Sequence, residues 1–192
     1  MENKNHKAIF TMVLVAMFAA VGAITSWISI PMPSGVPVTL QTFGMALIGF
    51  TLGYKYGTLS VAVYVALGAV GVPVFSGFMG GIGKIVGPTG GFIWGFIFMA
   101  FLCGLARLKV LEKRRPLVRA AAAILLGLAG LAVCHLLGVA QYTFVNSKGL
   151  GFGAAALLVS VPYLLKDIIS VIAAYFASIA ATKLMKKATH NN

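Results

Sequence analysis

A single acidic side chain lies inside an apolar stretch of this sequence. Asp167 belongs to VPYLLKDIIS, in the middle of a long apolar run, whereas the other two acids, Glu2 and Glu112, lie in polar stretches. An ionised side chain at membrane depth costs at least about 2.5 kcal/mol, so it should face the protein interior or a wet cavity. We therefore predict that Asp167 belongs to a functional site.

The neighbours of Asp167 give this site a polar face. Residues three or four positions apart share one face of a helix, which places Tyr163 and Ser170 beside Asp167. Lys166 is adjacent in sequence and points about 100° away, so we expect the two charges not to face each other. Lys166 is instead expected to snorkel or to reach a ligand carboxylate from the side.

Two further helix starts carry groups that could contact a ligand. In VTLQTFG, Gln41 is the only amide of its helix and should bond inward, either to a neighbouring helix or, as we favour, to a substrate. In GPTGGF, Thr89 can cap the helix or bond a ligand, and Gly90 and Gly91 allow a ligand or another helix to approach closely. A helix start of this kind also attracts anions.

The fifth apolar segment offers an aromatic ring and a histidine. Tyr142 and Asn146 lie near its outer end, where Tyr142 is either an interfacial residue or the wall of a ligand site. His135 lies deeper in the same segment. We expect it to bond to a neighbouring helix rather than to relay protons, because a relay needs a chain of acids.

Composition excludes several classes of protein. The chain of 192 residues is 60% hydrophobic and 9% charged, whereas a soluble domain is about half apolar and a quarter charged. The net charge of +12 does not indicate a nucleic-acid partner, because the basic residues lie at the ends of apolar runs. Cys103 and Cys134 are far from each other, so no metal site or disulfide is expected. GGIGK lacks the first glycine and the hydroxyl residue of a nucleotide-binding loop.

Six apolar segments predict an all-α integral membrane protein, with residues 1–192 forming one membrane domain. A helix spans the hydrocarbon core with ~20 residues, and the second and third segments, on either side of GYKYG, are short. The segments cover residues 8–30, 39–53, 57–72, 88–107, 117–145 and 154–182. Lys and Arg gather on the side shared by both termini, which predicts that the termini are cytoplasmic and the protein is a multi-pass protein of the cell membrane, surrounded by lipid.

The loop at 71–91 is predicted to form a lid on the outer side. It is rich in Gly and Pro and weakly charged, and irregular backbone near membrane depth persists only where protein buries it or where it lines a cavity. Its apolar residues prefer burial; they are Val72, Val74, Phe75, Phe78, Met79, Ile82, Ile85 and Val86.

Small residues repeat every four positions in the first helix. Ala16 and Ala20 form one such pair, and Ala19 and Ala23 form another. Small residues on one face let a second helix pack closely. The surface is suited either to packing inside the protein or to a partner subunit.

Three stretches, IPMPSGVPVTLQTFG, GAVGVPVFSG and GGIGKIVGPTGGFIWGF, resemble the signature stretches of the BioY family, and the resemblance extends over residues 8–183. That family provides the biotin-binding S component of energy-coupling factor (ECF) transporters. The resemblance implies six helices, a biotin site on the extracytoplasmic face, a transmembrane coupling subunit and two cytoplasmic ATPases. It also implies docking through the small-residue face of helix 1, and no cofactor in this chain, since only the partners use ATP.

The resemblance also assigns roles to individual residues. The family's sixth helix reads P-G-D-x-x-K; its Asp corresponds to Asp167, while Lys166 and Ser170 replace its Gly and its Lys. For biotin, Asp167 would accept N–H bonds from the ureido ring. Donors to the ureido carbonyl would come from Gln41, Thr89 or Ser170, apolar walls from Phe92, Tyr142 and Tyr163, and groups for the carboxylate from Lys84, Lys166 or the GPTGG helix start.

The function predicted from the sequence is therefore biotin binding for an ATP-driven importer in a prokaryotic membrane. A proton-coupled carrier working alone, with Asp167 as proton carrier, is the alternative. Little internal repeat symmetry and a single intramembrane acid disfavour it. A membrane enzyme or an assembly scaffold is a third hypothesis, and no nucleophile–base pair in the sequence supports an enzyme.

Overall fold

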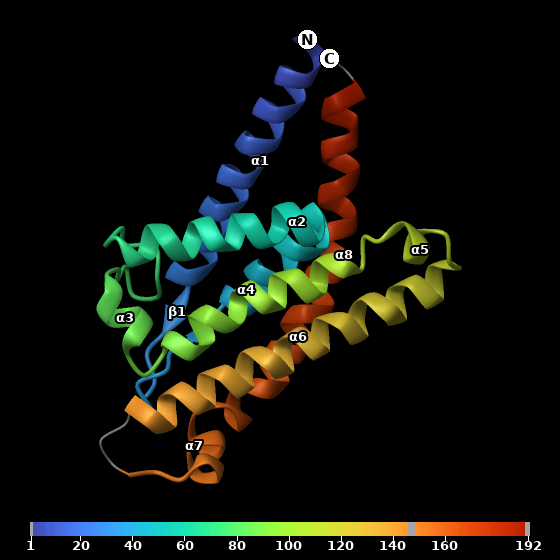
Figure 1. The fold of residues 1–192 in the computed structure, drawn as a ribbon. Coiled ribbons are helices and arrows are strands. Elements are labelled where there is room, and N and C mark those ends of the chain that lie inside the picture. Colours follow the sequence, from blue (N-terminus) through green and yellow to red (C-terminus); the bar gives the residue numbers. More distant parts are fainter. Residues whose placement is uncertain (1, 146–148, 191–192) are drawn as a thin grey trace.

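The computed structural model describes residues 2–145 and 149–190 and is mostly helical. Five helices are long, and three short helices and one two-stranded sheet lie between them (Figure 1). The long helices are α1 (Glu2–Trp27), α2 (Gln41–Ala69), α4 (Gly90–Leu105), α6 (Pro116–Val145) and α8 (Val161–His190). The short elements are β1 (Ser29–Ile30), β2 (Val38–Thr39), α3 (Ile82–Val86), α5 (Lys109–Glu112) and α7 (Phe152–Val159).

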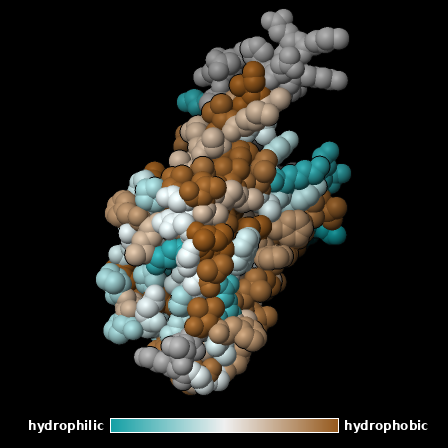
Figure 2. Space-filling view, turned by 60° about the vertical axis from the view of Figure 1, so that its left-hand side comes forward, coloured by the Kyte–Doolittle hydropathy of each residue, from teal (hydrophilic) through white to brown (hydrophobic). Residues whose placement is uncertain are grey.

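Three of the helices in the described ranges are long and apolar enough to cross a membrane. They are Ala8–Trp27, Pro116–Val145 and Val161–Met185, and α4 is a shorter apolar helix. The start of α1 and the end of α8 lie close together at the top of Figure 1. Apolar side chains form a band down one face of the molecule (Figure 2). These features confirm a helical membrane protein.

The predicted spans 39–53 and 57–72 are the two arms of one bent element, α2. Gly53 has a φ of 80° and interrupts the helical backbone, a conformation that glycine adopts without steric cost. The arms run back along each other, since Gln41 Nε2 donates to Tyr64 Oη at 2.8 Å. GYKYG, residues 53–57, was expected to separate the two spans as a turn. That expectation was wrong, because the chain reverses at Gly53 alone and is helical again immediately afterwards.

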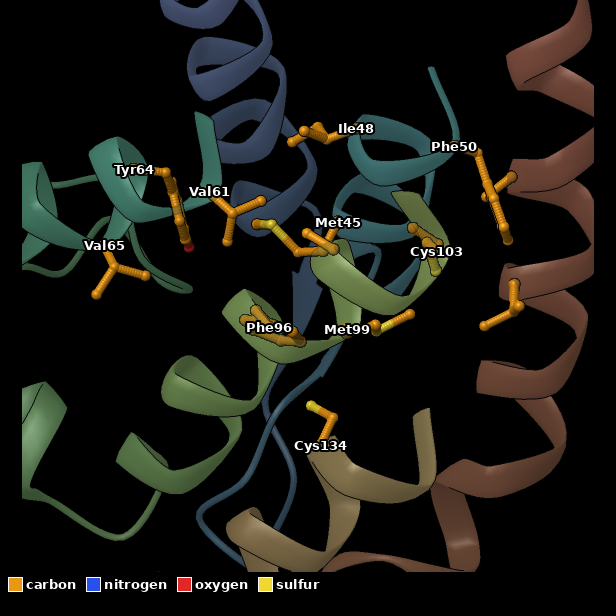
Figure 3. Packing of buried hydrophobic residues seen from close by; sticks show 14 of the residues in the cluster. Met45, Ile48, Phe50, Val61, Tyr64, Val65, Phe96, Met99, Cys103 and Cys134 are labelled. Atoms are coloured by element: carbon orange, nitrogen blue, oxygen red, sulfur yellow. The ribbon is translucent and has the colours of Figure 1, made fainter. Parts of the chain in front are cut away.

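The core forms where α4 packs between α2 and α6. Met45 of α2 and Met99 and Cys103 of α4 are fully buried, and Cys134 of α6 is buried below Met99 in the view of Figure 3. Glycine allows the helices to meet closely, because a Cβ on Gly95 would come within 2.6 Å of the Cα of Cys134. Close approach through small residues is how helices associate where lipid removes the hydrophobic driving force.

The two small-residue pairs of α1 have different environments. Ala19 and Ala23 are buried in the core, so the prediction that they contact a partner subunit was wrong; they serve packing within the chain. Ala16 and Ala20 are exposed. Only this second pair is free to meet another protein.

The predicted span 154–182 is broken at Ser160, between α7 and α8. Ser160 has φ −124° and ψ −61°, outside helical values. Pro162 follows in the first turn of α8, where a missing N–H costs little, whereas a proline inside a continuous helix would remove a backbone hydrogen bond. Asp167 therefore lies in the second turn of a helix, and not in the middle of a long one.

The loop between α2 and α4 is folded against the end of α1. Ser26 Oγ donates to the carbonyl of Val74, Trp27 Nε1 donates to Pro73 O at 2.8 Å, and the ring of Trp27 stacks on Phe78 with centroids 5.1 Å apart. Of the apolar residues expected to be buried in this loop, only three are: Val74, Phe75 and Ile85. The prediction was wrong for the others, which are exposed: Val72, Phe78, Met79, Ile82 and Val86.

Candidate functional site

A cavity lies beside Asp167, between the starts of α2, α4 and α8 and the part of α6 around His135. Its volume is about 60 Å³, measured as the space open to the centre of a water-sized sphere. Seven of the predicted site residues line it: Gln41, Lys84, Thr89, Phe92, Tyr163, Lys166 and Asp167. The structure thus brings together side chains that are far apart in the sequence.

Asp167 is 4% exposed and has a different neighbour at each carboxylate oxygen. Its Oδ2 lies 3.2 Å from His135 Nε2, and its Oδ1 lies 2.5 Å from Lys166 Nζ. The expectation that Lys166 and Asp167 do not face each other was wrong. Their Cβ directions diverge, but the flexible four-carbon stem of lysine lets the ammonium group turn back. Lys166 Nζ also donates to Thr39 O at 2.7 Å.

His135 links Asp167 to the break between α7 and α8. Its Nδ1 lies 2.8 Å from Ser160 Oγ. An ionised carboxylate only accepts hydrogen bonds, so Nε2 carries the proton that is donated to Asp167. In the neutral ring Nδ1 then accepts the Ser160 hydroxyl. These bonds confirm that His135 bonds to a neighbouring helix, and its ring also meets Phe92 edge to face at 5.7 Å.

The remaining capacity of Asp167 to accept hydrogen bonds lies at Oδ1. This oxygen is buried and accepts no well-directed hydrogen bond from the described residues, although Lys166 provides a compensating charge. A buried acceptor without a donor is costly and uncommon in proteins. In a cavity wall, such an atom is available to a ligand that brings N–H donors.

Gln41 has a structural role in addition to its place in the cavity wall. Its amide donates to Tyr64 Oη, and its Oε1 accepts from Thr39 Oγ1 at 3.1 Å. The alternative of a structural bond is therefore confirmed, and the bond joins the two arms of α2. A contact with a ligand remains compatible with it, because the amide has a second N–H.

Two tyrosines hold the loop between β1 and β2 over the cavity. Tyr163 Oη donates to Val36 O at 2.6 Å, and Tyr142 Oη donates to Ser34 O at 3.1 Å. Tyr142 lines a second, larger cavity of about 860 Å³ in the same measure. That outer cavity shares Lys84 and Thr89 with the inner one, so the two form adjoining chambers.

Several predicted residues lie away from the inner cavity. Ser170 is buried and borders a separate apolar groove with Leu165 and Ile169, and it does not line the inner cavity. A Cβ on Gly90 or Gly91 would collide with backbone carbonyls of α3 or α6, so these glycines serve packing. Asn146 lies outside the described residues.

Other cavity residues were not predicted from the sequence. They come from the β1–β2 loop and β2, from α2, from the α2–α4 loop, and from α4, α6 and α7, and are Val36, Pro37, Thr39, Thr42, Phe75, Ser76, Ile93, Phe96, Cys134, His135 and Val159. Thr42 is adjacent to Gln41 and could have been found from that position, whereas the apolar members carry no signal in a hydrophobic sequence. No group of three or more metal-ligating side chains occurs among residues 2–145 and 149–190.

Fold and cavity define a helical membrane protein with a partly polar cavity between its helices. Residues 1–187 match the model of the BioY family, and the chain belongs to this family. The resemblance seen in the sequence is confirmed.

The chain is similar to proteins named as biotin transporters. It is 38% identical over 178 residues to the biotin transporter BioY of Thermotoga maritima, covering 90% of this chain and 96% of the relative. It is 40% identical over 156 residues to the probable biotin transporter BioY of Pyrococcus horikoshii, covering 81% and 86%. Relatives of this kind are transporters and not enzymes, and they come from prokaryotes.

A solved structure shares the fold. The crystal structure of the S-component for biotin from an ECF-type ABC transporter has 28% sequence identity and a TM-score of 0.74, and the match covers 95% of this chain and 94% of that one. The agreement extends over nearly the whole of both chains, so the cavity lies within a shared architecture.

Proposed function

We propose that this protein is the biotin-binding S component of an ECF-type importer. The observation that carries the proposal is the buried Oδ1 of Asp167, an acceptor without a well-directed donor in the wall of a cavity between the helices. Similarity to biotin transporters and to an S-component for biotin supports the same ligand.

The cavity suits the chemistry of biotin. The ureido ring has two N–H donors for Asp167 and a carbonyl that Thr89 or the second N–H of Gln41 can bond. Phe92 and Tyr163 provide the apolar walls that small-molecule sites usually have. Lys84, which borders both chambers, and Lys166 are the cations available for the carboxylate.

The loop at 71–91 acts as the lid in this proposal. Its Phe75 and Ser76 line the inner cavity, and its backbone is tied to Ser26 and Trp27 at the end of α1. Opening the lid would break these contacts. The two arms of α2 together with the other long helices would form the six membrane segments, with both termini cytoplasmic.

The partners would be a transmembrane coupling subunit and two cytoplasmic ATPases, with docking through α1. Ala16 and Ala20 are exposed on that helix, and small residues allow a partner helix to approach closely. The basic residues near both termini are consistent with a cytoplasmic position.

Mass spectrometry of the purified protein tests the proposal most directly. Biotin should co-purify at close to one molecule per chain and be released on unfolding. Absence of binding when purified, ligand-free protein is titrated with biotin would refute it. Uptake by the protein alone in liposomes, driven by a proton gradient, would instead support the carrier alternative.

A further inference from the structure

A third cavity lies at the opposite end of the molecule and is lined by several basic residues. Its volume is about 230 Å³ in the same measure, and Arg107, Arg119 and Lys183 line it. They come from three segments: the chain after α4, the first turn of α6 and the late turns of α8. No described acidic side chain lines this cavity.

The cavity lies where apolar helices end. Arg107 follows the last residue of α4, Arg119 is near the start of α6 at Pro116, and Lys183 is close to Met185, where the apolar part of α8 ends. Asp167 precedes Lys183 by about 24 Å along the helix axis at 1.5 Å per residue. The site is therefore separate from the biotin cavity and lies at the level where lipid headgroups lie.

Arg107 uses only one nitrogen of its guanidinium group for hydrogen bonds to described residues. Its Nη1 donates to Thr51 O at 2.8 Å and to Thr182 Oγ1 at 2.9 Å. These bonds fix the plane of the group and leave Nε and Nη2 without a partner among the described residues. Two parallel N–H groups on one planar edge match two oxygens of a phosphate.

The side chains of Arg119 and Lys183 make no hydrogen bond or ion pair with the side chains that the structure describes. Basic residues that only orient a membrane segment normally extend toward water. Lys183 is exposed, but Arg119 is half-buried, and both border one cavity with Arg107, an arrangement of like charges that an anion would stabilise. Phe50, Tyr175 and Ile179 form the apolar part of the wall, which suits an anion with an apolar body.

We propose that this cavity binds the phosphate group of an anionic phospholipid from the membrane leaflet at whose headgroup level the cavity lies. The three cations would contact the headgroup, and the aromatic and aliphatic wall would contact the start of the acyl chains. Basic pockets between membrane helices are known to bind lipid headgroups in this way. The proposal does not depend on the identity of the transported ligand.

Native mass spectrometry of the detergent-solubilised protein tests the proposal with added phosphatidylglycerol, phosphatidylcholine or inorganic phosphate. Phosphatidylglycerol should bind at one molecule per chain and more tightly than phosphatidylcholine. The double variant R119Q/K183Q should bind it about 30-fold more weakly, taking roughly fivefold for each cation near the headgroup. The matched variant K109Q/R115Q removes the same charge from exposed positions outside the cavity and should bind as the wild type does.

Equal losses in the two double variants would show diffuse attraction and overturn the proposal. Tight binding of inorganic phosphate without a preference for the lipid would assign the cavity to a free anion and overturn it as well. If thermal unfolding showed that R119Q/K183Q does not fold, the lipid affinities of the single variants R119Q and R115Q would be compared instead.

Discussion

Replacing Asp167 with Asn changes the charge of the proposed biotin site with almost no change in volume. In the wild type, Oδ1 accepts no well-directed hydrogen bond and lies 2.5 Å from Lys166 Nζ, and Oδ2 bonds to His135. A hydrogen bond to a charged group contributes about 1.5–3 kcal/mol, and each 1.4 kcal/mol is tenfold in Kd. We therefore expect D167N to raise the Kd for biotin by about 10- to 150-fold.

Isothermal titration of biotin into purified, ligand-free protein measures this change. The asparagine amide would place a donor against either the ligand N–H or His135 Nε2, so rotation of the side chain cannot restore both contacts. Thr143→Val is a control, because Thr143 bonds only within α6, to Val139 O at 2.8 Å, and does not line the cavity. Wild-type affinity in D167N would refute the role of the carboxylate.

Three other predictions concern docking and stability. Ala20→Trp should abolish biotin uptake in cells while leaving biotin binding intact. The control Leu125→Trp, on the exposed side of α6, should preserve uptake. Loss of biotin binding in Ala20→Trp would contradict a docking role for this face. Gly53→Ala should destabilise the protein by about 1–2 kcal/mol, because a side chain is strained at a φ of 80°, and Gly153→Ala, in open space, should not lower the unfolding temperature. His135→Leu removes the donor to Asp167 and the partner of Ser160, so it should cost about 1–3 kcal/mol, and an unchanged unfolding midpoint would show that these bonds contribute nothing.

The position of the site could be predicted from the sequence because lipid makes polar groups conspicuous. Asp167 and Gln41 are exceptional in their apolar surroundings, and both line the cavity. The apolar half of the wall could not be predicted in this way. Phe96 and Val159 are typical of any membrane helix, and only the packing of α4 and α7 places them beside Asp167.

The errors in the predicted geometry come from treating each apolar run as an ideal helix. The break at Ser160 starts a new helix shortly before Asp167, and Ser170 lies almost one turn beyond Asp167 on α8 and does not line the cavity. Helical geometry describes the directions of Cβ atoms, but it does not describe the reach of a long side chain, so the contact of Lys166 with Asp167 was missed. The position of the Lys166 ammonium group also depends on Thr39 O, which is distant in the sequence.

The charges around the inner cavity restrict the kind of ligand that it can hold. Asp167 is balanced by Lys166 at 2.5 Å, which leaves Lys84 as the second cation in the wall. A cavity whose wall carries one anion and two cations favours a ligand with a single negative charge, since a cationic ligand would repel Lys84 in surroundings of low dielectric constant. Oδ1 of Asp167 additionally requires N–H donors from that ligand. Biotin, with its ureido N–H groups and one carboxylate, meets both requirements, whereas a proton carried on Asp167 would remove the acceptor and leave Lys166 without its counter-charge.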